Sequence, residues 1–270
     1  MIHRVDMDLP IDEQYHTRNV VISKERLMEI IELLLDKGLV PGTIEETIHD
    51  DKKFHLSFDD GYSEHLKIAK KLKKNFSLEK EHCTFSINVD NSINENYSGM
   101  DLIYNIIERK GLGELLTYAK NNDWKVDPNI DSIKEKYITL SPDEINDIRN
   151  KTDVRTSELK NLFLNGDQIK KLSDLFNIGS HGITHRDLRN HLDISKKEIH
   201  NSKRELETII GSKVSTMCYP EGKNNKKVRS ITKESGYGYG LSINHKKGDP
   251  FCVGRYCINR HLDRFMEDLK

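Results

Sequence analysis

The stretch HLSFDDGYSEHL, residues 55–66, places two adjacent carboxylates directly after an apolar segment. The apolar residues before them indicate a buried β-strand, and Asp59 and Asp60 stand at its end. Asp-Gly is a common turn dipeptide, so a plain turn explains the pattern as well as a functional site does. Two neighbouring carboxylates nevertheless repel each other unless a positive charge or solvent lies nearby. The stretch therefore points either to a turn or to a cation at a strand end.

Strands and helices alternate along the chain around this stretch. Strands are expected at residues 20–22, 54–58, 83–89, 177–181, 214–220 and 239–243, and helices at 26–37, 62–75, 166–176, 195–210 and 226–236. This alternation predicts a largely parallel α/β architecture. SFDDG, IGSHGITH and CYPEG each follow a predicted strand, and in parallel α/β barrels such strand ends converge on one rim.

Residues 90–164 interrupt the alternation. They are polar, rich in helix-forming residues and contain the only tryptophan, Trp124. We interpret them as a mainly helical insertion between barrel elements, within one domain that spans residues 1–270.

Composition excludes several classes of protein. The 270 residues carry 43 Lys+Arg against 44 Asp+Glu, a net charge of −1 that argues against a nucleic-acid-binding protein. No segment approaches the roughly 20 apolar residues that span a bilayer. The polar N-terminus has no apolar signal segment, so the cytoplasm is the expected compartment, and the four scattered cysteines are expected to be free thiols. The sequence does not indicate an oligomeric state.

The motif GSHGITH supplies His181 and His185, four residues apart. On a helical turn this spacing puts both imidazoles on one face, although the motif taken alone favours a solvated or core-satisfied pair. Together with Asp60 the pair forms a two-histidine, one-carboxylate set that leaves coordination positions open for water, the arrangement of catalytic metal sites. Asp59 then stays free to accept a proton from water.

SFDDG, SHGITH and YPEG, in this order, resemble the leading motifs of the polysaccharide deacetylase family, also called the NodB-homology group or carbohydrate esterase family 4. The similarity runs from about Val20 to Leu269 and is greatest to the branch with YPYG-type third motifs. It implies a distorted (β/α)7-type barrel with a helical insertion. It also implies a metal-dependent hydrolase that cleaves the amide of an N-acetylated carbohydrate.

The resemblance assigns roles to individual residues. Asp59 matches the general base, and the metal triad comprises Asp60, His181 and His185. Zinc is favoured by two histidines and a carboxylate, while Co²⁺, Ni²⁺, Mn²⁺ or Fe²⁺ would also fit. In the third motif the backbone N–H of Glu221 matches an oxyanion donor, and the motif's substrate and oxyanion site comprises Tyr219, Pro220, Glu221 and Gly222.

The sequence departs from the family pattern at several positions. Gly182 replaces the usual serine or threonine, Cys218 replaces an arginine that orients the base, and Glu221 replaces an aromatic residue. Arg255 resembles an arginine frequent in the YPYG branch and is a candidate partner of the base, although a surface position is equally compatible. The general acid is not apparent from the sequence: His261 is a candidate by position, with His245 and His191 as weaker ones.

Three functions are compatible with these motifs. The first is deacetylation of an amino sugar or glycan precursor in the biosynthesis or modification of surface polysaccharide. The second is a carbohydrate-binding protein on a catalytically impaired enzyme fold, suggested by Gly182 and Cys218. The third, a glycosidase using Asp59 and Asp60, is disfavoured because adjacent strand residues point to opposite faces and rarely flank a glycosidic bond.

Overall fold

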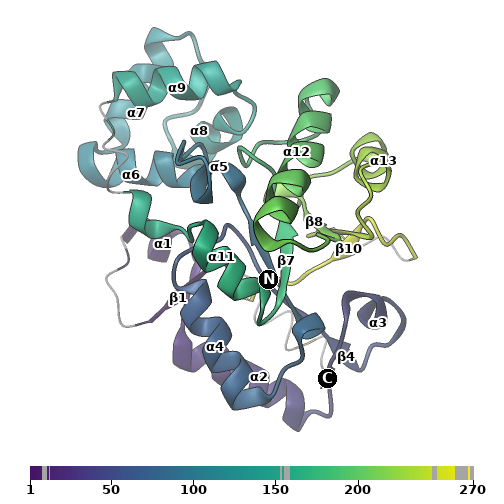
Figure 1. Ribbon diagram of the computed structural model, residues 1–270. Helices are drawn as coiled ribbons and strands as arrows, with labels where there is room; N and C mark the ends of the chain where they lie inside the picture. The colour runs from purple at the N-terminus through teal and green to yellow at the C-terminus, as the bar shows by residue number, and fades with distance from the viewer. Residues whose placement is uncertain are drawn as a thin grey trace.

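Six parallel strands form one curled sheet at the centre of the protein, in the spatial order β10-β9-β8-β7-β6-β5 (Figure 1). The computed structural model describes residues 1–7, 11, 13–152, 154, 159–244, 248–258 and 267. The strands are β5 (Leu56–Phe58), β6 (Cys83–Ile87), β7 (Asn177–Ser180), β8 (Thr216–Cys218), β9 (Tyr239–Ser242) and β10 (Val253–Gly254). Strands that neighbour each other in the sheet are also consecutive in the chain, so each connection crosses over outside the sheet. The predicted α/β fold with a curled parallel sheet is confirmed.

The N-terminal backbone lies between the two edges of this sheet. Ile2 forms a parallel bridge with Phe58 in β5, and the backbone N–H of Ile258 donates to the carbonyl of Met1 at 3.3 Å. The curved sheet is thereby extended across the gap between β5 and the segment after β10. Two short parallel pairs flank it: β1 (Arg4–Asp6) with β2 (Val21–Ser23), and β3 (Val40–Pro41) with β4 (Lys53–Phe54).

Helices around the sheet bury one apolar face each. They are α1 (Glu13–Thr17), α2 (Lys24–Asp36), α3 (Ile44–His49), α4 (His65–Phe76), α11 (Gly166–Ser173), α12 (Leu192–Ile210) and α13 (Lys226–Glu234). Helix α2 begins where the sequence predicts a cap, because the side chain of Ser23 accepts a hydrogen bond from the N–H of Arg26 at 3.1 Å. Its buried residues recur at helical spacing and pack into the main core: Leu27, Ile30, Ile31 and Leu34.

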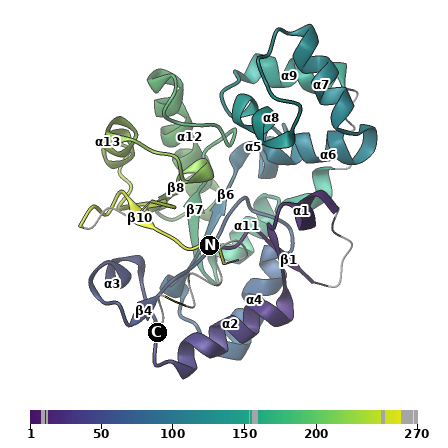
Figure 2. The ribbon, with the colours of Figure 1, turned by 180° about the vertical axis from the view of Figure 1, so that it is seen from behind.

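Residues between β6 and β7 form a group of helices beside the sheet (Figures 1 and 2). These are α5 (Val89–Ser92), α6 (Met100–Lys110), α7 (Leu112–Asn121), α8 (Ile130–Tyr137) and α9 (Pro142–Lys151). Helices α6 to α9 share a second hydrophobic cluster, which also includes Tyr15, Val20 and Tyr62 from the rest of the chain, whereas Val89 of α5 belongs to the main core. The helical character expected for residues 90–164 is thus present, and its hydrophobic contacts reach the edge of the central sheet.

Several predicted elements differ from the observed ones in detail. The strand expected at 54–58 is split between β4 and β5, and the helix after it begins at His65 instead of Tyr62. The helix begins later than expected because the turn before it is not helical: Asp60 has a φ of 76° and Gly61 a φ of 78°. Strands β1 and β10 were not expected, since each is only two or three residues long.

None of the helices in the described part of the chain is both long and apolar enough to cross a membrane. The cytoplasmic location stays a prediction.

Candidate metal centre and active site

Asp59 and Asp60 follow β5 at the carboxyl edge of the sheet. Asp59 continues the backbone pairing, donating its N–H to the carbonyl of Ile2 at 2.8 Å, whereas Asp60 turns away with a φ of 76°. The left-handed conformation is tolerated by aspartate better than by most side chains. The turn therefore separates the two adjacent carboxylates, so that each has different neighbours.

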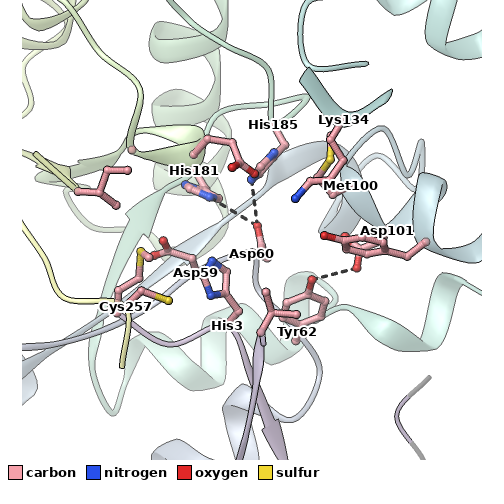
Figure 3. Close-up of a pocket in the computed structure, with 16 residues that line it drawn as sticks. His3, Asp59, Asp60, Tyr62, Met100, Asp101, Lys134, His181, His185 and Cys257 are labelled. Atoms are coloured by element: carbon pink, nitrogen blue, oxygen red, sulfur yellow. Dashed lines mark hydrogen bonds and ion pairs between the residues drawn. The ribbon is translucent and has the colours of Figure 1, made fainter. Parts of the chain in front are cut away.

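His181 and His185 follow β7 in a loop (Figure 3). The expectation that they share one face of a helical turn is wrong, because residues 181–185 form no helix. Gly182 has a φ of 78° and His185 a φ of 55°, and these two left-handed residues fold the loop back on itself. The rings lie 4.8 Å apart between centroids, at an interplanar angle of 72°.

Glu198 of α12 holds this loop in place. Its carboxylate accepts from the backbone N–H groups of Ile183 at 2.7 Å and Thr184 at 3.0 Å, and from the Thr184 hydroxyl at 2.7 Å. A Cβ added at Gly182 would lie 3.2 Å from Glu198 Oε2. The carboxylate thus occupies the space next to position 182, so the loop is braced although that position has no hydroxyl.

The three candidate metal ligands converge. His181 Nε2 and His185 Nε2 lie 3.5 Å and 3.4 Å from Oδ1 of Asp60, as drawn in Figure 3. One ligand atom from each residue lies within 4.8 Å of the others. Atoms that bind one tetrahedral zinc ion at about 2.0–2.2 Å are roughly 3.3–3.6 Å apart. The spacing and the nitrogen and oxygen donors therefore fit a divalent cation such as zinc, with coordination positions to spare.

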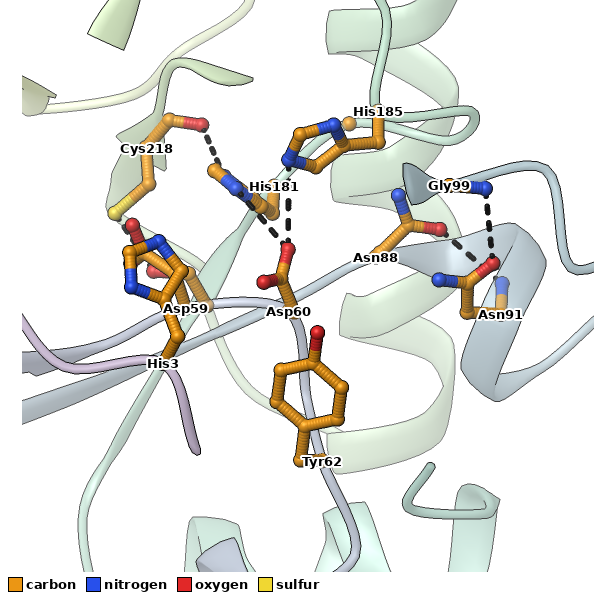
Figure 4. A network of polar contacts seen from close by, with 12 residues as sticks. His3, Asp59, Asp60, Tyr62, Asn88, Asn91, Gly99, His181, His185 and Cys218 are labelled. Carbon is orange, nitrogen blue, oxygen red and sulfur yellow. Dashed lines mark hydrogen bonds and ion pairs between the residues drawn. The ribbon is translucent and has the colours of Figure 1, made fainter. Parts of the chain in front are cut away.

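The protonation states of both imidazoles suit metal binding. His181 Nδ1 is 2.8 Å from the carbonyl of Cys218, which can only accept, so Nδ1 carries the proton and Nε2 presents its lone pair (Figure 4). Burial lowers the pKa of His181 to about 4 and also lowers the pKa of His185. Both rings are neutral near pH 7, the form that binds metal.

The pKa of Asp60 is raised, not lowered. Burial, followed by the charges of Asp101 and Asp59, holds it well above the ordinary value for a carboxyl group. A bound cation would offset this unfavourable charge, since a positive ion favours the ionised carboxylate.

Arg255 pairs with Asp59. Burial acts to raise the pKa of Asp59, but the Arg255 guanidinium outweighs it and holds that pKa well below the usual range. Nη1 and Nη2 of Arg255 donate to the two oxygens of Asp59 at 2.8 and 2.9 Å, and Nη1 also donates to Ser57. Arg255, directly after β10, therefore contacts the base, and its Nη1 also lies 3.7 Å from Sγ of Cys218, the residue at the place where the family pattern has its arginine. Cys218 at that place is a buried thiol whose pKa is raised to about 12 by burial.

The YPEG motif forms a tight turn after β8. Glu221 has a φ of 53° and Gly222 a φ of 65°, and a Cβ at Gly222 would come within 2.5 Å of Ile243. Glu221 and Gly222 line the cavity above the candidate metal ligands, whereas Tyr219 and Pro220 do not. Tyr219 is fully buried and donates its hydroxyl to the carbonyl of Phe251 at 3.0 Å. Its position supports a structural role in the turn.

None of the remaining candidate acids is found at this cavity among the described residues. His261 and His245 lie outside the described residues, and His191 is exposed at the start of α12, away from the cavity lining. Instead, His3 lines the cavity and lies beside Asp59 in Figures 3 and 4. The charge of His3 contributes to lowering the pKa of both Asp59 and Glu221, which places it near both.

The helices between β6 and β7 complete the cavity. Asp101 of α6 is buried and accepts from the hydroxyls of Tyr15 at 2.6 Å and Tyr62 at 2.9 Å. Lys134 of α8 also lines the cavity and points toward it in Figure 3.

Sequence reasoning missed four of these residues, namely His3, Asp101, Lys134 and Glu198. His3 had a weak signal, since it precedes the apolar-alternating residues of β1. The other three lie on helices whose facing direction depends on tertiary packing, so no local pattern identifies them.

Comparison with known proteins agrees with this geometry. Residues 142–240 match the family model described as polysaccharide deacetylase. The resemblance to polysaccharide deacetylases is confirmed. The matched range contains the histidine loop and the YPEG turn, while Asp59 and Asp60 lie before it. No curated protein matches the chain significantly.

Several solved structures share the fold over the whole chain. The Streptococcus pyogenes deacetylase PplD, solved in complex with acetate, has a TM-score of 0.61 at 14% identity, covering 100% of this chain and 96% of its own. A de-N-acetylase from Aggregatibacter actinomycetemcomitans has a TM-score of 0.57 at 18% identity, with coverage of 100% and 97%. IcaB from Ammonifex degensii has a TM-score of 0.59 at 14% identity, with coverage of 99% and 92%. At these identities the likeness is evidence for the shared NodB-like fold.

Proposed function

We propose that this protein is a metal-dependent deacetylase that hydrolyses the N-acetyl group of an amino sugar in a glycan or glycan precursor, during the synthesis or modification of surface polysaccharide. The observation that carries the proposal is the convergence of Asp60, His181 and His185 within 4.8 Å, beside an ionised Asp59. The confirmed resemblance to polysaccharide deacetylases supports the same reaction class.

Asp60, His181 and His185 would hold the cation. A bound divalent ion supplies Lewis acidity, which polarises the acetyl carbonyl and makes water more acidic. The remaining requirements of amide hydrolysis fall to the chain's own side chains and backbone.

Asp59 is suited to act as the general base. It is ionised at neutral pH, and its two bonds to Arg255 fix its orientation, so it can accept a proton from the attacking water. A pKa held this low makes it a weak base in thermodynamic terms, and transfer of a proton to it must be favoured by the acidity that the cation confers. Glu221 lines the cavity with its backbone in a left-handed turn, and we assign to its backbone N–H the stabilisation of negative charge on the acetyl oxygen.

His3 is the described histidine best placed to protonate the leaving amine. It lines the same cavity as Asp59 and is not one of the three candidate metal ligands. An amine leaves slowly as an anion, so a proton donor near the carbon–nitrogen bond is needed to complete the reaction. His261, which lies outside the described residues, stays a prediction for the same role.

The alternative of a catalytically impaired binding protein loses its motivation. Glu198 braces the loop at Gly182, and Arg255 orients Asp59 although Cys218 replaces the family's arginine. A glycosidase is also disfavoured, because Asp59 is engaged on both oxygens by Arg255 and Asp60 faces the two histidines.

Acetate release tests the proposal directly. Purified protein loaded with zinc is expected to release acetate from at least one member of a panel of N-acetylated sugars and oligosaccharides, and a chelator is expected to abolish the release. An Asp60→Ala variant should contain less than stoichiometric zinc and release none. Acetate release that persists after complete metal removal would refute the metal-dependent mechanism, and sugar binding without turnover by zinc-loaded protein would favour the binding protein.

A further inference from the structure

Two cavities meet above the candidate metal centre. The inner one, of about 110 Å³, is lined by the candidate ligands together with Asp59, His3 and Asp101. The outer one, of about 580 Å³, lies between the turn at residues 17–19, helix α8 and the YPEG turn. Both cavities are lined by the same three side chains, Lys134, Glu221 and Ile243, which therefore stand at their junction.

The sizes of the cavities assign them to different parts of a substrate. Pockets that enclose small-molecule ligands generally measure roughly 300–1,000 Å³, and the inner cavity is well below that range. It suits a small group such as acetamide beside the candidate metal ligands. The outer cavity falls within the range, so a sugar ring attached to that acetamide would lie at the junction and extend outward.

The two charged groups at the junction are free to bind a ligand. Among the described residues, neither Lys134 Nζ nor the Glu221 carboxylate has a hydrogen-bond or ion-pair partner. Lys134 Nζ lies over the Tyr104 ring, 5.7 Å from its centroid. Burial acts to raise the pKa of Glu221, but Lys134 and His185 outweigh it and lower that pKa, so the carboxylate is charged at neutral pH. Unpartnered charged groups facing a shared cavity are expected to bind a polar ligand.

Ile243 adds an apolar surface to the same place. Its side chain is 48% exposed, although it is a large hydrophobic residue. Gly222 allows this approach, since any Cβ there would collide with Ile243. A pyranose ring presents both hydroxyl groups and an apolar C–H face, and the junction offers a donor, an acceptor and an apolar contact that match them.

We propose that Lys134, Glu221 and Ile243 form the binding site for the ring of an uncharged N-acetylated amino sugar, with Lys134 donating to one hydroxyl and Glu221 accepting from another. This inference rests on the proposed deacetylase function and specifies its substrate class. It also gives the helices between β6 and β7 a direct part in substrate binding, because Lys134 belongs to α8.

The distribution of charge favours an uncharged ring over an anionic one. The junction carries one positive and one negative side chain. The outer cavity is equally balanced, with three basic and three acidic residues: Arg18, Lys134, Lys223, Asp131, Glu135 and Glu221. Arg18 is already paired with Asp131. A phosphate or nucleotide attached to the sugar would therefore meet as much repulsion as attraction, whereas hydroxyl groups can use both signs of charge.

Lys134→Met and its matched control Lys136→Met test the proposal. Lys136 is on the same helix and is half-buried like Lys134, but its ammonium lies over the Trp124 ring at 5.7 Å and does not line either cavity. With zinc-loaded protein and an uncharged N-acetylglucosamine oligomer, Lys134→Met is expected to raise KM about tenfold, the effect of losing one charge-assisted hydrogen bond. Lys136→Met is expected to leave KM unchanged. Glu221→Gln, which keeps the backbone N–H, should also raise KM for the oligomer.

Two comparisons separate a binding role from a structural one. The ratio of activity on the oligomer to activity on 4-nitrophenyl acetate, which has no sugar ring, should fall about tenfold in Lys134→Met at unchanged zinc content. Wild-type protein should prefer the uncharged oligomer to UDP-N-acetylglucosamine. An unchanged KM in both Lys134→Met and Glu221→Gln, or a preference for the anionic substrate, would overturn this inference alone. Absence of acetate release by the wild type from every sugar would instead overturn the proposed function.

Discussion

Replacing Arg255 by methionine should both weaken the fold and move the pH dependence of catalysis. Arg255 is held in a buried, two-bond pair with Asp59, with side-chain exposures of 7% and 2%. Methionine has a similar length and no charge, so the variant leaves the Asp59 carboxylate buried without its cation. Arg255 also donates to Ser57 at 3.1 Å, and that bond would be lost as well.

The magnitude follows from the burial of the pair. Removing one partner of a buried ion pair costs about 3–5 kcal/mol, because the other charge remains desolvated. One pKa unit corresponds to about 1.36 kcal/mol, so this loss corresponds to an upward shift of roughly 2–4 units in the pKa of Asp59.

The sign of the pH effect differs between the two proteins. In the wild type the folded-state pKa of Asp59 is below its unfolded value, so its contribution to stability is present above the unfolded pKa and is lost as the pH falls through the folded pKa. In Arg255→Met the folded-state pKa is raised. If it exceeds the unfolded value, ionising the buried carboxylate destabilises the variant progressively as the pH rises.

Acetate release measured from pH 4 to 9 would test this reasoning. The acid limb of kcat/KM that belongs to Asp59 should move up by about two pH units or more in Arg255→Met, at unchanged zinc content. Arg189→Met is the control for losing a two-bond arginine–carboxylate pair elsewhere. Arg189 is 43% exposed and its partner Asp187 only 4%, but neither lines the cavity, so this variant is expected to keep the wild-type pH profile of acetate release even where it loses stability. An Arg255→Met enzyme with a wild-type pH profile would refute the role of Arg255 in setting the charge of Asp59.

Three further changes have distinct expected outcomes. Glu198→Gln removes the charge from the brace of the histidine loop and should weaken zinc binding about 10–100-fold in competition with a chromophoric chelator; an unchanged affinity would exclude a positioning role. His3→Gln should lower kcat on an N-acetyl sugar by about 10²–10⁴-fold but affect 4-nitrophenyl acetate far less, because nitrophenolate leaves without a proton; equal losses on both would argue against His3 as the acid. Added zinc should raise the melting temperature of the wild type and not of Asp60→Ala, and an equal rise in both would place the ion elsewhere.

The motifs were predictable from the sequence because each is short and lies at the end of a strand. SFDDG, SHGITH and YPEG follow β5, β7 and β8, and parallel strands bring their carboxyl ends to one edge. Their convergence therefore needed only the order of the strands. The local reason given for the histidine pair was wrong, since a fold-back with two left-handed residues has no periodic signature that distinguishes it from a helical turn.

Contacts between residues far apart in the sequence were harder to predict. Arg255 reaches Asp59 across 196 residues, and this depends on how far the sheet curls between β5 and β10. His3 reaches the cavity because the N-terminal backbone joins the sheet next to β5. The polar composition of the first residues gave little indication of this pairing, since backbone bridges leave almost no trace in the side-chain pattern.

Tyr62 connects the helices between β6 and β7 to the site. It comes two residues after Asp60, in the turn that directs Asp60 toward the histidines, and its hydroxyl donates to Asp101 of α6. Its ring stacks on Phe163 at 5.3 Å, at the other end of the inserted segment. Both ends of the segment thus contact the residue next to the turn that carries Asp60. Because these contacts belong to the second hydrophobic cluster, loosening that cluster should displace the candidate metal ligand Asp60 as well as Lys134, so the packing of the helices and the geometry of the site are energetically coupled.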